Sequence, residues 1–280
     1  MGATQAVAYD LTAACSGFVL GLVTACNHVR VGGPVQRVAV IGADCLSRTV
    51  DWGDRRTSIL FGDGCGALIV ERAEEGAECA LLGYDMRSDG QGGPSLNCKY
   101  EGARHELPLG VGGGAEAGAE AGAGADGGAD ADADNEHRAE VEAGGGGAQA
   151  AAGSPLTVRN RGEFEYLAMN GTEVFKFAVR AVPQVVTGAL EMAGKQVEDI
   201  DWLVLHQANA RILSAAADRL GVERERVASN VERYGNTSAA SVPLVLDEYV
   251  RAGKIKNGDV LATAGFGAGL TWASALVRWG

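Results

Sequence analysis

Three residues with complementary chemistry lie far apart in this chain of 280 residues. Cys15 lies in the phrase AACSGF, His206 in LHQANARI and Asn236 in YGNTSAAS. A thiol can accept an acyl group as a thioester, and an imidazole with a carboxamide can stabilise the oxyanion or enolate of a second thioester. These groups, brought into one pocket, indicate an acyltransferase that forms carbon–carbon bonds.

The elements around these residues would place them at the ends of strands and helices. Residues 5–11 and 36–44 read as buried strands, with an apolar helix at 16–32 between them. Cys15 would then lie at a helix N-terminus, where the partial positive charge favours a thiolate. His206 ends a predicted strand at 201–207, at the edge of a sheet where ligand sites are common in α/β folds.

The rest of the pattern is also mixed α/β, and the loop that holds Asn236 precedes a predicted helix. A kink is expected at Pro183, because proline lacks the N–H that a helix interior needs. The further predicted strands are 64–73, 78–86, 258–269 and 270–279, and the further helices are 170–194, 210–221 and 238–253. Periodicity alone therefore predicts the α/β class.

The middle of the chain has a different composition. Residues 113–153 hold nine acidic residues and one arginine, so they contribute most of the formal charge of −12. They include one valine and no aromatic residue, too little apolar surface to offset the entropy of ordering. We expect a disordered insertion that acts as a solvated spacer; an acidic interaction segment is the alternative.

Several phrases in the same order resemble the β-ketoacyl-acyl carrier protein synthase III family. They are AACSGF, DRRTSILFGDGCGA at 54–67, HQAN, GNTSAAS and GFGAGLTWASALVRWG. The resemblance covers the chain outside 113–153. It implies a layered αβαβα fold of the thiolase type, with residues 1–112 as the C-terminal part of a first half and 154–280 as a second half. Relatives carry a further segment before the cysteine, so the first half is expected to be truncated at its N-terminus.

The resemblance also implies an activity. Cys15 would accept acetyl from acetyl-CoA, and His206 with Asn236 would drive decarboxylative condensation with malonyl-acyl carrier protein. The product would be acetoacetyl-acyl carrier protein, which initiates type II fatty acid biosynthesis. Both thioesters are substrates, and no cofactor is implied.

Further site residues follow from the resemblance. The N–H of Ala268, where the family usually has glycine, would join that of Cys15 in the oxyanion hole, and Phe266 would lie beside the thiol. Arg55 matches a family residue that contacts the nucleotide end of the coenzyme. Asn209 matches a family residue that contacts the phosphopantetheine arm. Neither GFGAG nor GDGCG at 62–66 has the lysine ending of a phosphate-binding loop.

Partners follow in the same way. Basic residues on two predicted helices would receive an acidic carrier protein: Lys176, Arg180, Arg211 and Arg219. A solvated helix face is the alternative for each, and Asp218 dilutes the patch. We expect a homodimer for the full-length protein and no binding to nucleic acid, given the acidic charge.

Other functions remain open at this stage. A truncated, inactive homologue that only pairs with intact subunits is the main alternative. Papain-type proteases share the order Cys, His, Asn, but the surroundings of Cys15 do not match them. A thiolase would need a second catalytic cysteine near the C-terminus, and none follows Cys98. A chalcone-synthase-like enzyme shares the three residue types but not the GNTSAAS phrase.

The remaining cysteines and histidines receive structural interpretations. Without a CxxC pair, the sequence predicts neither a zinc site nor a disulfide framework. The cysteines and histidines interpreted as structural are Cys26, Cys45, Cys65, Cys79, Cys98, His28, His105 and His137. The sequence contains no run of eighteen or more apolar residues and therefore predicts no membrane span. For the compartment we expect the plastid stroma, with a bacterial cytoplasm as the alternative.

Overall fold

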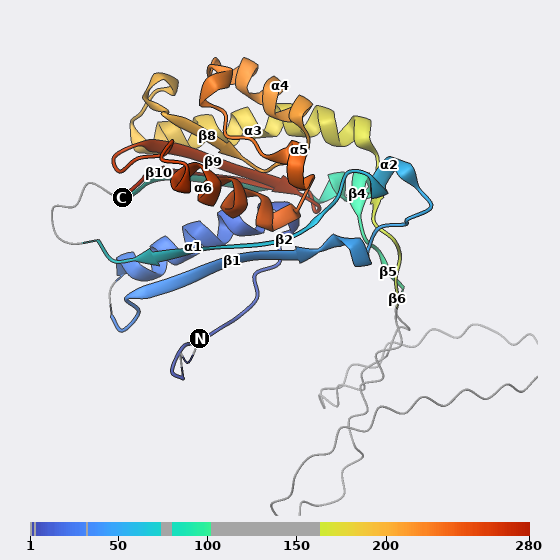
Figure 1. The fold of residues 1–280 in the computed structure, drawn as a ribbon, viewed down its shortest axis with the longest axis horizontal. Helices are drawn as coiled ribbons and strands as arrows, with labels where there is room; N and C mark the ends of the chain where they lie inside the picture. The colour runs from blue at the N-terminus through green and yellow to red at the C-terminus, as the bar shows by residue number, and fades with distance from the viewer. Residues whose placement is uncertain (1, 3, 32, 74–79, 102–162) are drawn as a thin grey trace, which may run out of the picture. The chain divides into compact units, whose positions relative to one another are not determined.

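The computed structural model describes residues 2, 4–31, 33–73, 80–101 and 163–280. The predicted insertion at 113–153 lies outside these residues, as do Cys79, His105 and His137. The fold below is that of the described residues (Figure 1).

The first part of the chain builds one helix and a long two-stranded sheet. A 3-10 turn η1 (Ala14–Ser16) leads into α1 (Gly17–Val31). Strand β1 (Arg37–Cys45) then pairs antiparallel with β2 (Asp63–Glu71), close to the predicted bounds. The predicted strand at 5–11 is wrong, because this segment is exposed and pairs with no described strand. A strand needs a neighbour for its backbone groups, and apolar residues alone do not supply one.

The second sheet has four strands in the order β3–β10–β9–β8. These are β3 (Ala80–Ser88), β8 (Trp202–Leu205), β9 (Val260–Gly267) and β10 (Thr271–Arg278). Strand β9 runs parallel to β8 and antiparallel to β10, and all of its residues are buried. Strand β3 precedes the insertion in sequence yet pairs with β10. The domain boundaries predicted above stay predictions.

Helices cover both faces of the four-stranded sheet. Figure 1 shows α3 (Gly171–Ala193) and α4 (Ala210–Leu220) on one face. On the other face α1 and α6 (Ser241–Arg251) lie between this sheet and β1–β2. The described residues thus form successive α, β, α and β layers, which confirms the mixed α/β class.

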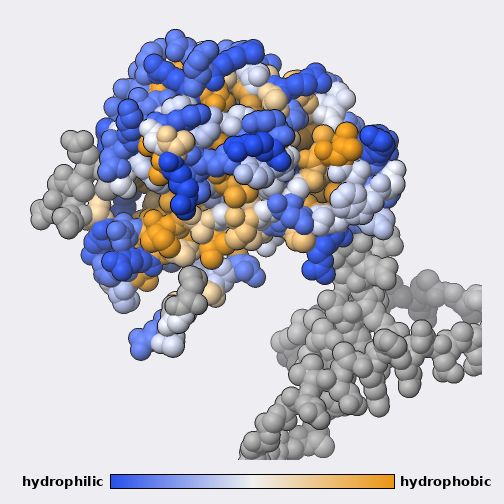
Figure 2. All heavy atoms as spheres, viewed as in Figure 1, coloured by the Kyte–Doolittle hydropathy of each residue, from blue (hydrophilic) through white to orange (hydrophobic). Residues whose placement is uncertain are grey.

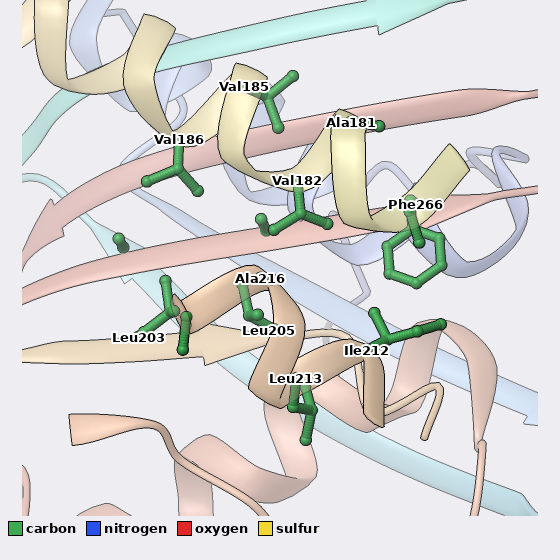
Figure 3. Close-up of a cluster of buried hydrophobic side chains, with 14 of the residues drawn as sticks. Ala181, Val182, Val185, Val186, Leu203, Leu205, Ile212, Leu213, Ala216 and Phe266 are labelled. Atoms are coloured by element: carbon green, nitrogen blue, oxygen red, sulfur yellow. The ribbon is translucent and has the colours of Figure 1, made fainter. Parts of the chain in front are cut away.

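The larger core cluster lies where α3 and α4 meet the sheet (Figure 3). Val182 and Val186 of α3 face Leu203 and Leu205 of β8, and all four are almost fully buried. Helix α3 continues through Pro183 as one element. Local signals end the helices, since Asn170 and Asn209 cap the starts of α3 and α4, while Gly194 and Gly221 end them in left-handed conformations.

Short elements connect these layers near the site. They are η2 (Leu46–Arg48), α2 (Arg55–Ser58), η3 (Gly90–Ser95), β4 (Leu96–Asn97), β5 (Tyr100–Glu101), β6 (Glu163–Phe164), β7 (Ala168–Met169), η4 (Val197–Asp199), η5 (Arg224–Arg226), α5 (Val231–Tyr234) and η6 (Ser238–Ala240). One described stretch, Ala14–Val31, is long and apolar enough to pass as a membrane span. It packs as a core helix between the two sheets.

Candidate active site

Cys15 sits in the turn η1, directly before α1, and is 8% exposed. Strand β9 passes so close to this turn that only glycine fits there. A Cβ on Gly267 would lie 2.6 Å from the backbone nitrogen of Cys15, and one on Gly265 would lie 3.0 Å from its carbonyl oxygen. Phe266, between them, points to the opposite face of the strand, as alternation requires. The two glycines of the GFG phrase therefore allow the backbone of β9 to approach the backbone of the Cys15 turn closely.

The thiol of Cys15 is not activated in the resting site. Burial raises its pKa to about 11, and the negative charge of Asp44 adds to the rise. A side-chain hydrogen bond from Ser238 acts in the opposite direction and favours the thiolate. The expected thiolate at the helix N-terminus is therefore outweighed by desolvation, which disfavours any buried charge.

His206 follows β8 directly and is 1% exposed. Its backbone N–H donates to the carbonyl of Ala264 on β9 over 2.7 Å, which extends the parallel pairing by one residue. Its Nδ1 lies 2.7 Å from the hydroxyl of Ser241, and its ring meets Phe266 edge to face, with centroids 5.1 Å apart. Burial lowers the His206 pKa to about 3, partly opposed by the Ser238 carbonyl. The imidazole is therefore neutral near pH 7.

Gln207, the next residue, is fully buried and anchors the HQAN loop. Its Nε2 donates to the carbonyls of Leu205 and Ala228 over 2.7 and 3.2 Å, and its Oε1 accepts from the N–H of Asn230 over 3.1 Å. These bonds hold the loop in one conformation beside the imidazole. Sequence reasoning missed this role, although a glutamine directly after a buried strand is a signal for it.

Asn236 is 8% exposed, in a turn that Gly235 makes possible. Gly235 has φ of +65°, and a Cβ there would lie 2.8 Å from the carbonyl oxygen of Leu60. The backbone of Asn236 bonds to Leu60 and Gly62, with distances of 2.8 and 2.9 Å. Its side-chain Oδ1 accepts from the N–H of Ser238 over 2.8 Å. The amide is thereby oriented, and its Nδ2 remains as a donor for the site.

One cavity of about 290 Å³ brings the three residues together. Its wall also includes the turn residue Ser238 and apolar side chains from several short elements. The lining residues are Ala14, Cys15, Asp44, Leu46, Thr49, Leu60, Phe61, Leu96, Asn97, Cys98, Leu167, Met169, Gly171, Val174, His206, Ala208, Asn209, Ile212, Asn236, Ser238, Phe266 and Ala268. A mostly apolar cavity with a few convergent polar groups is typical of a small-molecule site.

Of the further site residues that the family resemblance implied, only some line this cavity. Phe266, Ala268 and Asn209 line the cavity, and Asn209 also caps α4 by accepting from the N–H of Ile212 over 2.9 Å. Arg55 is exposed at the start of α2 and is not among the lining residues. The oxyanion-hole and coenzyme roles of these residues stay predictions.

The four basic residues lie on two helices that pack together. Lys176 and Arg180 are exposed on α3, and Lys176 pairs with Glu173 over 2.8 Å. From α4, Arg219 donates to the carbonyl of Val179, and the Arg211 guanidinium lies 5.3 Å from the ring centre of Phe175. The structure therefore joins them in one surface region.

Other groups in the described residues show no metal-site geometry. No group of three or more histidine, cysteine or acidic side chains among them is arranged so that it could hold a metal ion. Five cysteines there are free: Cys15, Cys26, Cys45, Cys65 and Cys98. The exposed His28 makes a side-chain contact to the Tyr9 hydroxyl over 3.2 Å.

Family models match both ends of the described fold. Residues 9–90 match the model described as 3-oxoacyl-(acyl-carrier-protein) synthase III, and residues 190–279 match the model of its C-terminal part. The chain is similar to the β-ketoacyl-(acyl-carrier-protein) synthase III of Microcystis aeruginosa, with 45% identity over 280 residues, which are 100% of this chain and 69% of the relative.

A plant protein and solved structures agree with these matches. The chloroplastic β-ketoacyl-(acyl-carrier-protein) synthase III B of Cuphea wrightii is 48% identical over 275 residues, covering 98% of this chain and 58% of that protein. The Thermus thermophilus synthase III structure superposes with a TM-score of 0.71 and 38% identity, over 97% of this chain and 68% of that one. The Pseudomonas aeruginosa synthase III structure superposes with a TM-score of 0.72 and 33% identity, over 98% of this chain and 67% of that one.

Proposed function

The chain belongs to the 3-oxoacyl-(acyl-carrier-protein) synthase III family, and from this we propose that it condenses acetyl-CoA with malonyl-acyl carrier protein. The reaction releases carbon dioxide and gives acetoacetyl-acyl carrier protein, the first condensation of type II fatty acid biosynthesis. One observation supports this most: Cys15, His206 and Asn236 line a single cavity, although they come from three separate parts of the chain.

In the first half-reaction Cys15 is the nucleophile. Its sulfur attacks the acetyl carbonyl, the bond to the coenzyme sulfur breaks, and the thiol proton is balanced by protonation of the departing thiolate. The backbone N–H groups of Cys15 and Ala268 would stabilise the oxyanion, as in other acyl transfers.

In the second half-reaction His206 and Asn236 hold the malonyl thioester oxygen. The carbon–carbon bond to the carboxylate breaks, its electron pair forms an enolate, and carbon dioxide leaves. The enolate carbon attacks the acetyl group on Cys15, whose sulfur departs and regains a proton. The Asn236 amide is already oriented and donates through Nδ2. The Ser241 hydroxyl donates to the Ser238 carbonyl and therefore accepts from Nδ1–H of His206, so Nε2 of the neutral imidazole faces the substrate without a proton and must gain one before it can donate. Donors fixed before the reaction stabilise the enolate most effectively.

Mass spectrometry after incubation with acetyl-CoA tests the first half. We expect an acetyl adduct on Cys15, located by peptide mapping, and no adduct in Cys15→Ala. The other described thiols, such as Cys45 and Cys65, serve as internal controls because they are exposed in the same chain. A folded protein that forms no adduct, or one that is acetylated equally in Cys15→Ala, would contradict the proposal.

Asn236→Asp separates the two half-reactions. The aspartate still accepts from the Ser238 N–H but lacks the donor, so condensation should fall by roughly 10²–10³, the usual loss for one oxyanion donor. Acetylation of Cys15 should fall by less than about tenfold, because only the added negative charge raises the thiol pKa. Equal losses in both assays would show that Asn236 has no separate role in condensation.

We also propose that the carrier protein docks on the basic region of α3 and α4. Exposed Arg180 and Arg211 lie on neighbouring helices, and their positive charge suits an acidic partner. Arg180→Glu and Arg211→Glu should raise the KM for malonyl-acyl carrier protein without changing acetylation by acetyl-CoA. Lys256→Glu, an exposed lysine outside the predicted region, is the matched charge control. An unchanged KM in both arginine variants would place docking elsewhere.

Assembly and compartment are proposed from the relatives. We propose a homodimer, tested by light scattering of the purified protein at several concentrations; a concentration-independent monomer mass would overturn it. We propose the plastid stroma, supported by the chloroplastic Cuphea wrightii relative. Immunodetection in fractionated cells tests it, and recovery in the cytosolic fraction would exclude it.

A further inference from the structure

Ser241 is a buried serine that contacts the imidazole of His206 but is not among the residues that line the cavity. It begins α6, and its hydroxyl bonds back to the carbonyl of Ser238 over 2.8 Å, as serines in helices often do. Two further contacts of the same oxygen reach another segment. The backbone N–H of Gln207 donates to it over 3.2 Å, and Nδ1 of His206 lies 2.7 Å away. The hydroxyl therefore joins the start of α6 to the HQAN loop.

The hydrogen-bonding capacity of this hydroxyl assigns the ring proton of His206. A hydroxyl offers one proton and two lone pairs. The Ser238 carbonyl can only accept, so it takes the proton of the Ser241 hydroxyl. The backbone N–H of Gln207 can only donate, so it occupies one lone pair. Nδ1 of His206 meets the other lone pair over 2.7 Å, a hydrogen-bond distance that requires a proton on Nδ1. A neutral imidazole has one ring proton, so Nε2 carries none.

The surroundings hold these three contacts in place. Ser241 and His206 are each 1% exposed and Gln207 is fully buried, so solvent does not replace a hydrogen bond that is lost here. The side chain of Gln207 makes three hydrogen bonds to backbone groups, which keep its own N–H directed at Ser241. The ring of Phe266 packs edge to face against the imidazole and restricts its rotation.

We propose that Ser241 is a positioning residue that fixes His206 as the tautomer with its proton on Nδ1. The hydrogen bond at one ring nitrogen decides which nitrogen is protonated, so a single buried hydroxyl decides what the imidazole can do. Nε2 meets the cavity as a proton acceptor, and the Asn236 amide is the donor present before any proton is transferred. Because Ser241 does not line the cavity, it acts through His206. Its part in condensation rests on the function proposed above.

Nitrogen-15 NMR of protein labelled in its histidine rings tests the tautomer without any substrate. A protonated and an unprotonated ring nitrogen differ widely in chemical shift, and their couplings to the carbon-bound ring protons distinguish Nδ1 from Nε2. The chain has four histidines, so the signals of His206 are those lost in His206→Asn. Near pH 7 we expect a protonated Nδ1 and an unprotonated Nε2 in the wild type. A wild-type spectrum with the proton on Nε2 would overturn the proposal.

Ser241→Thr and Ser241→Val form a matched pair that tests the hydroxyl. Both add the same methyl group and have the same shape, but only threonine keeps a hydroxyl. Ser241→Thr should retain the wild-type pattern of shifts. In Ser241→Val the proton on Nδ1 would face a methyl group, so we expect most of the population to carry the proton on Nε2 instead. An unchanged tautomer in folded Ser241→Val, or the same change in both variants, would overturn the role of the hydroxyl.

These results remain distinct from those for the proposed function. The wild-type spectrum tests the tautomer even if a variant does not fold, and circular dichroism establishes which variants do. The expected tautomers in the wild type and the two variants would support the role of Ser241 even if the protein transferred no acetyl group. A protein that is acetylated on Cys15 but carries the His206 proton on Nε2 would keep the proposed function and overturn this inference.

Discussion

The two largest sheets of the described residues, the four-stranded sheet and the two-stranded sheet β1–β2, differ in how their faces are covered. In the four-stranded sheet every residue of β9 is buried, with helices on both faces. In the two-stranded sheet the side chains of β1 and β2 alternate, and Ile41 and Ile69 on the outward face are 53% and 59% exposed. Figure 2 shows apolar surface in this region.

This difference explains where the chemistry lies. His206 extends β8 and bonds to β9, while Gly265 and Gly267 of β9 hold the turn of Cys15. A strand packed on both faces holds the atoms that it carries rigidly, because protein interiors are close-packed and have low compressibility. The outward side chains of β1–β2 are exposed in the described part of the chain, and none of them lines the cavity, so we expect substitutions there to leave the site unmoved.

The largest expected effect on the free energy of unfolding comes from a substitution in β9, and a substitution in β2 serves as its comparison. In Gly267→Ala the new Cβ would lie 2.6 Å from the Cys15 nitrogen, and backbone must move to make room. We expect a loss of about 3 kcal/mol in the free energy of unfolding, at the upper end for overpacking, together with loss of acetylation. Ala67→Val, on the outward face of β2, should change the unfolding free energy by less than about 0.5 kcal/mol. Urea denaturation measures both, and similar losses would contradict the contrast.

A smaller effect concerns acid stability in the four-stranded sheet. The folded protein holds His206 at a pKa of about 3, below the ordinary value of 6.5. Between these values the unfolded chain binds the additional proton, so stability falls as the pH decreases from about 6.5 toward 3. The slope from this one group is about 1.4 kcal/mol per pH unit.

Comparison of variants isolates that slope. In His206→Asn the free energy of unfolding should decrease less steeply between pH 6 and 4 than in the wild type. His28→Asn removes an exposed imidazole at the surface of α1 and serves as the control. Parallel pH profiles for the wild type and His206→Asn would show that the buried imidazole is not the source of the acid sensitivity.

The sequence predicted local features well and long-range ones less well. The ends of α3 and α4 follow from asparagine and glycine at their caps, signals that lie within a few residues. The strand at 5–11 failed because its pairing depends on a distant neighbour. The thiolate at Cys15 was expected from the helix that follows, whereas the raised pKa arises from burial, and the strand that approaches Cys15 most closely, β9, is more than 200 residues away in sequence.

Ser241 shows the same limit. Its contact with His206 joins two segments 35 residues apart that meet at one cavity. Residues that position others are therefore harder to find from sequence than the reacting groups, whose chemical types already suggest a reaction.

The smallest expected effect lies at the solvent end of the two-stranded sheet. Arg37 on β1 pairs with Glu71 on β2 over 2.7 Å, with side chains 76% and 59% exposed. Water screens such a pair, so Arg37→Ala should lower the free energy of unfolding by less than about 0.5 kcal/mol, and 0.5 M salt should reduce even this difference. The same substitution should leave acetylation of Cys15 unchanged, since neither residue lines the cavity. A loss comparable with that of Gly267→Ala would mean that the β1–β2 sheet is coupled to the site as tightly as β9 is, and the contrast between the sheets would fail.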